Sequence, residues 1–221
     1  MERALVIGAS GGIGSAIAAE LQARGVAVDG LSRSADGLDV TDETSVERAL
    51  GALTGPYDLI FVATGALEIG GHTPEKAISQ VTPDALLAQF RTNAIGPLLV
   101  LKHALRLLPK DRPAVFAALS ARVGSIGDNA IGGWHSYRTA KAALNQLIHG
   151  AAIELRRTHR QAVAVCLHPG TVETAFTAKY AGRHKTVPAS QAAANLVNVI
   201  EALSPAQSGG FFDYAGREIR W

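Results

Sequence analysis

Cysteine, aromatic residues and net charge are all scarce in this chain of 221 residues. Its one cysteine, Cys166, excludes an intramolecular disulfide and a cysteine-rich metal site. The net charge is only +2, without a basic block, which argues against a dedicated nucleic-acid binder. No apolar run approaches the roughly 18 residues of a membrane helix, and the stretch Ala4–Ile7 is too short for a secretion signal. We therefore expect a soluble cytoplasmic protein with no nucleic-acid or membrane partner.

Apolar residues and glycine, by contrast, are abundant. Hydrophobic residues make up 48% of the chain, which supplies a sizeable core and excludes a disordered protein. The length fits one domain that spans residues 1–221. The 23 glycines beside 5% aromatics favour an α/β protein with tight strand-to-helix turns over a β-sandwich.

Short apolar strands alternate with helical patterns along the chain. The expected strands are Ala4–Ile7, Val26–Leu31, Leu59–Ala63, Val115–Leu119, Val163–Leu167 and Phe211–Tyr214. The expected helices are Ile13–Arg24, Ser45–Leu53, Pro83–Leu108 with Gly96 and Pro97 as candidates for a break, Trp134–Arg157 and Pro188–Leu203. Continuous apolar strands separated by helices indicate a parallel sheet covered on both faces. We predict a doubly wound, Rossmann-type α/β fold with about seven strands.

A glycine-rich turn joins the first expected strand to the first helix, and it reads Gly8-Ala-Ser-Gly-Gly-Ile-Gly14. Glycine allows a tight turn, and the free N–H groups of a helix N-terminus bind anions such as a pyrophosphate. The spacing Gly-x3-Gly-x-Gly differs from the G-x-G-x-x-G of many dinucleotide sites. Alone, the turn also fits an ordinary strand-to-helix connection, but its place after the first strand favours a dinucleotide site.

Tyr137 and Lys141 lie four residues apart in the expected helix Trp134–Arg157. Residues at that spacing share one helix face, where an ammonium would favour the ionised phenol and lower its pKa from about 10. A tyrosine of this kind can donate or accept a proton as a general acid or base. A short Tyr-x3-Lys pattern also occurs as a surface pair, so the motif needs further support.

Five motifs in this order resemble the short-chain dehydrogenase/reductase family over essentially the whole chain. They are Gly8-x3-Gly12-x-Gly14, Asp39-Val40, Asn93, Tyr137-x3-Lys141 and Pro169-Gly170-x-Val172-x-Thr174. The stretch 120–137 is more narrowly similar to the C-factor and sniffer-type carbonyl reductase branch. The resemblance implies an oxidoreductase that transfers a hydride between NADP(H) and a carbonyl or alcohol substrate.

The resemblance also implies residue roles. Tyr137 would exchange a proton with the substrate oxygen. Lys141 would lower the tyrosine pKa and bind the nicotinamide ribose, and Asn93 would hold a water in a proton relay to Lys141. The implied cofactor-binding residues are Gly8, Ser10, Gly12, Ile13 and Gly14 at the pyrophosphate, Asp39 and Val40 at the adenine, Ala63, Thr64 and Gly65 after the third strand, and Pro169, Gly170, Val172 and Thr174 near the nicotinamide, with Tyr137 and Lys141. Thr64 stands in a tripeptide that is usually Asn-Ala-Gly, and we expect it to replace part of the asparagine's hydrogen bonding.

The serine that polarises the substrate oxygen in such enzymes has two candidates here. Relatives often carry Ser-Ser after the strand that is Val115–Leu119 in this chain, but this chain has Ser120-Ala121, which puts alanine in the usual place. Ser120 lies at the strand end, and Ser125 lies twelve residues before Tyr137, close to the usual spacing. We favour Ser120, because a strand fixes position better than a residue count along a loop, and keep Ser125 as the alternative.

The end of the second strand bears on cofactor choice. An acidic residue there would bind a ribose 2′-hydroxyl and repel a 2′-phosphate. This chain has Ser32 and Arg33 instead, and Arg33 can pair with a phosphate. Asp29 is the competing acid, but it falls three residues early, within the strand. We predict NADP as the cofactor, with NAD as the alternative.

Three further expectations complete the prediction. The polar segment 175–188 follows a strand end and is a candidate lid over the substrate. The seven histidines show no zinc-type pairing, so we expect no metal, and the resemblance implies a homodimer or homotetramer. The competing function is a C-factor-like signalling or dinucleotide-sensing protein with weak turnover.

Overall fold

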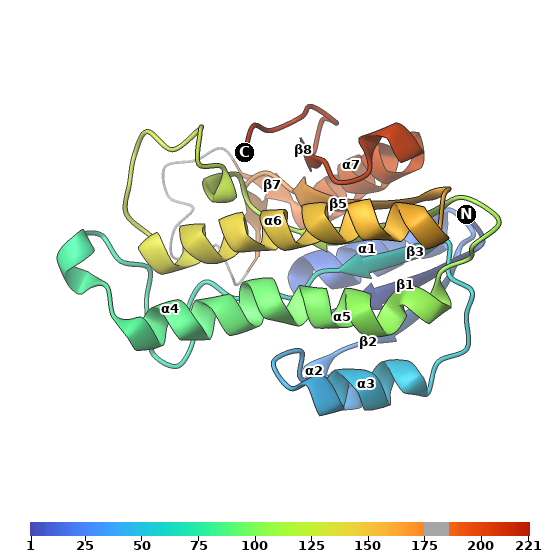
Figure 1. Cartoon of the computed structure of the whole chain (residues 1–221), viewed down its shortest axis with the longest axis horizontal. Helices are drawn as coiled ribbons and strands as arrows, with labels where there is room; N and C mark the ends of the chain where they lie inside the picture. The colour runs from blue at the N-terminus through green and yellow to red at the C-terminus, as the bar shows by residue number, and fades with distance from the viewer. Residues whose placement is uncertain (175–185) are drawn as a thin grey trace.

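The computed structural model describes residues 1–174 and 186–221. The described residues form one parallel sheet of six strands in the order β2-β1-β3-β4-β5-β8 (Figure 1). The strands are β1 (Arg3–Ile7), β2 (Ala27–Leu31), β3 (Leu59–Val62), β4 (Ala114–Leu119), β5 (Ala162–His168) and β8 (Phe211–Asp213). The predicted Rossmann-type fold is confirmed, with one strand fewer than the seven expected.

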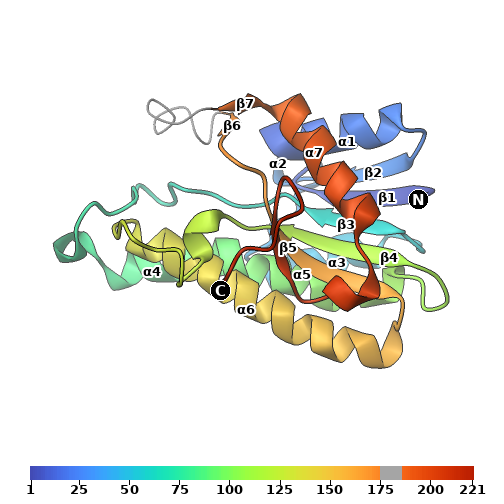
Figure 2. The same ribbon diagram turned by 90° about the horizontal axis from the view of Figure 1, so that it is seen from above.

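Helices cover both faces of the sheet, as Figure 2 shows in profile. On one face lie α1 (Gly12–Ala23) and α7 (Ala189–Ala202), which pack against each other. On the other face lie α3 (Glu43–Gly51), α5 (Gly96–Ala104) and α6 (His135–Thr158), with α4 (Pro83–Phe90) packed on α6. The shorter elements are α2 (Arg33–Asp36), the 3₁₀ turns η1 (Ile78–Gln80), η3 (Leu105–Leu107), η4 (Arg122–Gly124) and η5 (Pro205–Gln207), and the strands β6 (Val172–Glu173) and β7 (Val187–Pro188).

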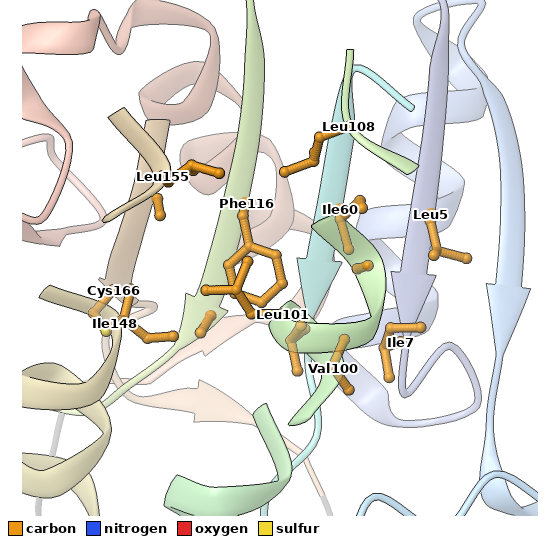
Figure 3. Packing of buried hydrophobic residues seen from close by; sticks show 14 of the residues in the cluster. Leu5, Ile7, Ile60, Val100, Leu101, Leu108, Phe116, Ile148, Leu155 and Cys166 are labelled. Carbon is orange, nitrogen blue, oxygen red and sulfur yellow. The ribbon is translucent and has the colours of Figure 1, made fainter. Parts of the chain in front are cut away.

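The core consists of two apolar layers, because successive side chains of a strand point to opposite faces. In β1, Leu5 and Ile7 join the layer under α5 and α6, together with Phe116 and Ile148 (Figure 3). Ala4 and Val6 of the same strand join the layer under α1 and α7. The runs of consecutive buried residues in β1, β3 and β4 follow from this two-sided burial.

The predicted break in the long middle helix lies earlier than Gly96 and Pro97. Helix α4 passes into a π-helical segment, η2 (Arg91–Ile95), before α5 begins at Gly96. Pro97 occupies the first turn of α5, where its missing N–H is tolerated. The wider π turn interrupts the regular helix at Asn93, one of the expected site residues.

The sheet topology fixes where a ligand site can form. After β2 the chain crosses to β3 on the other side of β1, which is a topological switch point. Gly8, Ala63 and Ser120 directly follow β1, β3 and β4 at the carboxyl edge. Of the expected lid 175–188, residues 175–185 lie outside the described residues, and β7 pairs with β6. Within the described residues, no helix combines the length and hydropathy needed to cross a bilayer.

Candidate active site

The glycine turn lies at the carboxyl edge of the sheet, directly after β1. Gly8 has a φ of 85°, which favours glycine, and its N–H donates to the Leu31 carbonyl at 2.7 Å. A Cβ atom on Gly14 would lie 2.1 Å from the Gly8 oxygen, so only glycine fits there. Helix α1 begins without a side-chain cap and has no acidic residue in its first turn. Its first N–H groups therefore remain available to an anion.

The segment 169–174 packs against this turn. A Cβ atom on Gly12 would lie 2.8 Å from the Thr174 Cγ2 atom, so the two segments are in close contact. Val172 is buried and pairs with Val187 in the small β6–β7 sheet. The expected residues from both segments thus meet: Ser10 is exposed and Ile13 half-buried in the turn, and Pro169 and Gly170 are half-buried opposite.

At the end of β2, Ser32 is buried and caps the short helix α2, accepting a hydrogen bond from the Ala35 N–H at 3.2 Å. The Asp36 carboxylate, which the sequence analysis did not consider, accepts from the Ser32 N–H at 2.7 Å. Arg33 is exposed, and its guanidinium has no hydrogen bond or ion pair within residues 1–174 and 186–221. A Ser with an acid four residues later, at a strand-to-helix junction, is the signal that finds Asp36.

Asp29 is committed elsewhere. Its carboxylate accepts hydrogen bonds from Arg3 and Tyr57, each at 2.7 Å, and it lies in the middle of the edge strand β2, opposite Leu5 of β1. Hydrogen bonding from Tyr57 and then the Arg3 guanidinium hold the pKa of Asp29 below its usual value, against the effect of burial. Asp29 is therefore a structural acid, away from the carboxyl edge.

Two expected adenine-side residues hold a turn. Asp39 Oδ1 accepts from the Thr41 N–H at 2.8 Å and from its hydroxyl at 2.7 Å, and these bonds lower the pKa of Asp39. Val40 is buried against α5, because a Cβ atom on Gly96 would lie 2.9 Å from the Val40 Cγ2 atom. The pair thus fixes the chain between α2 and α3.

After β3, the Ala63 N–H donates to the Ile7 carbonyl at 2.8 Å, which continues the sheet pairing. The Thr64 hydroxyl is buried and has no hydrogen-bond partner among the described residues. The expectation that Thr64 replaces part of an asparagine's hydrogen bonding is therefore wrong in this structure, because its Oγ1 atom reaches no donor or acceptor.

Tyr137 and Lys141 lie in the first two turns of α6, and both are buried. The Lys141 Nζ atom is 5.7 Å from the centre of the Tyr137 ring and donates to the Leu119 carbonyl at 2.8 Å. Burial raises the pKa of Tyr137 and lowers the pKa of Lys141 to about 8. The predicted pair is brought together, but the expected lowering of the tyrosine pKa is wrong here, because desolvation of the phenolate dominates.

Asn93 is fully buried on the π segment. Its Oδ1 atom accepts from the Ala66 N–H at 3.1 Å, and its Nδ2 atom donates to the Ala66 carbonyl at 2.9 Å and to Gln89 at 2.6 Å. A Cβ atom on Gly65 would lie 2.8 Å from Asn93 Oδ1 and 3.6 Å from Lys141 Nζ, so the two groups approach the same point. Gln89, four residues before Asn93, was missed; the i, i+4 amide pair is the signal for it.

The two candidate serines lie at different positions along the axis of α6. The Ser120 hydroxyl donates to Asn145 Oδ1 at 2.7 Å, and Asn145 lies eight residues beyond Tyr137, about 12 Å along the axis. A Cβ atom on Gly124 would instead lie 2.8 Å from the Lys141 backbone, and the Val123 carbonyl accepts from Arg138. The segment 120–125 therefore runs along α6 toward Tyr137.

Ser125 is buried at the far end of that segment. Its Oγ atom accepts from the Asp128 N–H at 3.1 Å, and its own proton has no acceptor among the described residues. Ser120, by contrast, already donates its proton to Asn145. These contacts favour Ser125 over Ser120 as the serine near Tyr137.

The half-buried His168 and the buried Glu75 are two groups that the sequence analysis did not assign. His168 ends β5, directly before Pro169, and its Nδ1 atom has no partner among the described residues. Burial lowers the pKa of His168 to about 4, so the imidazole is neutral near pH 7. Glu75 is a buried carboxylate whose nearest partners lie at the start of α6. Neither residue belongs to a motif with fixed spacing, so only the fold reveals them.

Comparisons with known proteins show which proteins this chain is similar to. A family model described as enoyl-(acyl carrier protein) reductase matches residues 8–209. The 1-hydroxy-2-glutathionyl-2-methyl-3-butene dehydrogenase of Rhodococcus sp. (strain AD45) is 31% identical, with all of both chains aligned. The C-signal protein of Myxococcus xanthus is 34% identical over 78% of this chain and 98% of its own.

Solved structures share the fold. The NADPH-bound carbonyl reductase from chicken fatty liver superposes with a TM-score of 0.85 at 24% identity, over 100% of this chain and 99% of that one. A short-chain dehydrogenase/reductase of Burkholderia multivorans with bound NADP superposes with a TM-score of 0.81 at 26% identity, over the same shares of the two chains.

Proposed function

Because the chain belongs to the short-chain dehydrogenase/reductase family of oxidoreductases, we propose that it is an NADP(H)-dependent carbonyl reductase that uses Tyr137 as its general acid. The observation that carries this proposal is the burial of Tyr137 beside Lys141 at the carboxyl edge of the sheet. A phenol and an ammonium in that place can protonate the oxygen of a carbonyl compound as it is reduced.

The carboxyl edge fits a nicotinamide dinucleotide. The uncapped start of α1 offers N–H groups to a pyrophosphate, and Gly8 and Gly14 allow close approach. The bound nicotinamide would supply or accept the hydride. Support for NADP over NAD comes from the exposed Arg33 guanidinium, the commitment of Asp29 to Arg3 and Tyr57, and the NADP held by the Burkholderia multivorans relative.

Each polar group has a distinct task in this proposal. The raised pKa of Tyr137 keeps its phenol protonated near pH 7, as a proton donor requires. Lys141, with a pKa of about 8, is mostly charged at that pH and would hold the nicotinamide ribose. Asn93 fixes the Ala66 backbone near Lys141, which supports a proton relay through water. We further propose Ser125, with Ser120 as the alternative, as the hydroxyl that polarises the substrate oxygen.

Replacement of Tyr137 by Phe tests the proposal. The ring is kept and the proton donor is lost, so NADPH-dependent turnover should fall about 10²–10⁴-fold while cofactor binding is retained. Tyr57→Phe is the control, because it removes a buried phenol just before the start of β3, at the amino end of the strand and opposite to the carboxyl edge. Turnover of Tyr137→Phe within a few-fold of the parent enzyme would exclude Tyr137 as the acid.

The substrate panel decides between this function and a sensor. The panel should hold diverse carbonyl compounds, including one with a glutathionyl group, because a full-length relative carries that group in the name of its substrate. Similarity to C-signal favours the competing function, a signalling or dinucleotide-sensing protein. Tight NADPH binding without turnover on any panel member would favour the sensor. The expected homodimer or homotetramer stays a prediction that sedimentation of the purified chain would test.

A further inference from the structure

Glu75 joins the segment after β3 to the start of α6. Its side chain is only 3% exposed, and its Oε2 atom accepts a hydrogen bond at 3.2 Å from the Ser136 N–H, 61 residues later in the chain. Its main-chain carbonyl accepts from the Trp134 N–H at 2.5 Å. One residue therefore binds two backbone N–H groups of the turn that leads to Tyr137, that of Ser136 through its side chain and that of Trp134 through its main chain.

Among the described residues, the start of α6 has no side-chain cap of its own. Trp134, at its N-cap, has a φ of 51° and makes no side-chain capping bond, and the first turn of α6 contains no acidic residue. The first N–H groups of a helix need acceptors, and its positive end favours an anion. The Glu75 carboxylate, from a segment distant in sequence, supplies an acceptor for one of these N–H groups and a negative charge near the start of the helix.

The carboxylate is in its charged form. Burial alone would raise the pKa of Glu75, but hydrogen bonds from its own backbone and from Ser136, with the nearby His135, lower it overall. The other oxygen, Oε1, is buried without a partner among the described residues. A buried carboxylate with one unsatisfied oxygen is costly, so packing alone does not account for Glu75 at this place.

The main chain is adapted to this contact. Gly133 has a φ of 66°, and a Cβ atom on it would lie 3.3 Å from the Glu75 carbonyl oxygen. Glycine there allows the segment 133–136 to lie directly against Glu75. Both the side chain and the main chain of Glu75 thus contact the segment that leads into α6.

We propose that Glu75 is a positioning residue for Tyr137: its carboxylate and carbonyl fix the first turn of α6, and so the phenol, relative to the segment after β3. The inference rests on the proposed role of Tyr137. An error of about 1 Å in the placement of a catalytic group can cost about 10²-fold in rate. Glu75 should therefore affect the chemical step more than the binding of cofactor.

The test compares Glu75→Ala, Glu75→Gln and the control Lys76→Ala, an exposed neighbour in the same segment. We expect Glu75→Ala to lower kcat about 10–100-fold with the KM for NADPH unchanged. Glutamine keeps an acceptor for the Ser136 N–H, so Glu75→Gln should recover most of that loss. Lys76→Ala should match the parent enzyme.

Hydrogen exchange provides a readout that does not depend on activity. Amide exchange across residues 134–138 should be faster in Glu75→Ala than in the parent chain, and near normal in Glu75→Gln. The proposal is overturned by parent-like kcat in Glu75→Ala, by unchanged exchange there, or by a glutamine variant as slow as alanine. Full turnover in Tyr137→Phe would instead overturn the proposed function, and the exchange result would still test the contact.

Discussion

The shift in the pKa of Lys141 measures how strongly the candidate site is desolvated. Lys141 is 3% exposed, and its ammonium donates to the carbonyl of Leu119. Burial lowers the pKa of Lys141 to about 8, from 10.5. We predict that replacement of Lys141 by Met removes a pH-dependent part of the free energy of unfolding of the cofactor-free protein.

The direction follows from proton binding. Between about pH 8 and pH 10.5 the unfolded chain keeps a proton on Lys141 that the folded chain has released, so this residue makes stability rise with pH. Below about pH 8 both states are protonated and its contribution is constant. For these two pKa values, linkage gives a gain of about 2 kcal/mol from about pH 7 to about pH 9.5.

The assay is urea unfolding of the parent chain and Lys141→Met at several pH values in that interval. The difference in free energy of unfolding, parent minus variant, should increase by about 2 kcal/mol. Subtraction removes the contributions of titrating groups that do not interact with Lys141. The Cys166 thiol does interact with Lys141, but burial raises its pKa to about 12, so it stays protonated in the folded chain across this interval. Lys76→Met, an exposed lysine, should show no such trend. A flat difference for Lys141→Met would refute the desolvation of this ammonium.

Two further predictions concern the serines and the cofactor. Ser125→Ala should lower turnover about 10²–10³-fold, as loss of one hydrogen bond to a developing oxyanion does. Ser120→Ala should keep turnover within a few-fold but lose about 1 kcal/mol of stability with its bond to Asn145; the opposite pattern would restore Ser120 to the role. The parent chain should bind NADPH more tightly than NADH, and Arg33→Ala should shift this preference toward NADH, because a cation that faces a 2′-phosphate is lost. Equal affinity of the parent chain for both cofactors, measured by fluorescence titration, would contradict the role of Arg33.

The regular elements were predictable because their signals are local. Two-sided burial makes β1, β3 and β4 continuous apolar runs, and the observed bounds differ from the predicted ones by only a few residues. The predicted helix Trp134–Arg157 matches α6 to within one residue at each end. The short helix α2 and the two-residue strands β6 and β7 were missed, because such short elements carry no periodic pattern.

The π segment shows where local signals were insufficient. Proline is the usual cause of a helix break, so the break was predicted at Gly96 and Pro97. The helical hydrogen-bond pattern instead changes before them, to a π-helix over Arg91–Ile95. The reason is tertiary: Asn93 binds both backbone groups of Ala66, which belongs to the segment after β3. The sequence of the helix alone could not have predicted that contact.

The choice between Ser120 and Ser125 stays a prediction, and the sequence could not decide it for a related reason. The end of β4 places residue 120 accurately, but it does not say which way the side chain points. Ser120 points to Asn145, deep along α6, and the chain then turns through η4 before it reaches the level of Lys141. Strand position and side-chain direction are separate facts, and successive residues of an extended chain point to opposite sides.

The contacts that build this site share one property, which explains what the motifs omit. Lys141 binds the Leu119 carbonyl, Asn93 binds Ala66, and Glu75 binds the Ser136 N–H, across 22, 27 and 61 residues of chain. In each case a side chain holds a main-chain group, and any residue type can supply a main-chain group. Such contacts leave no pair of residue types at a fixed spacing, whereas Tyr137 and Lys141 share a helix face and do. It follows that the motif identifies the proposed reacting groups, while the residues that fix their geometry must be sought among buried polar side chains that bind main-chain groups distant in sequence.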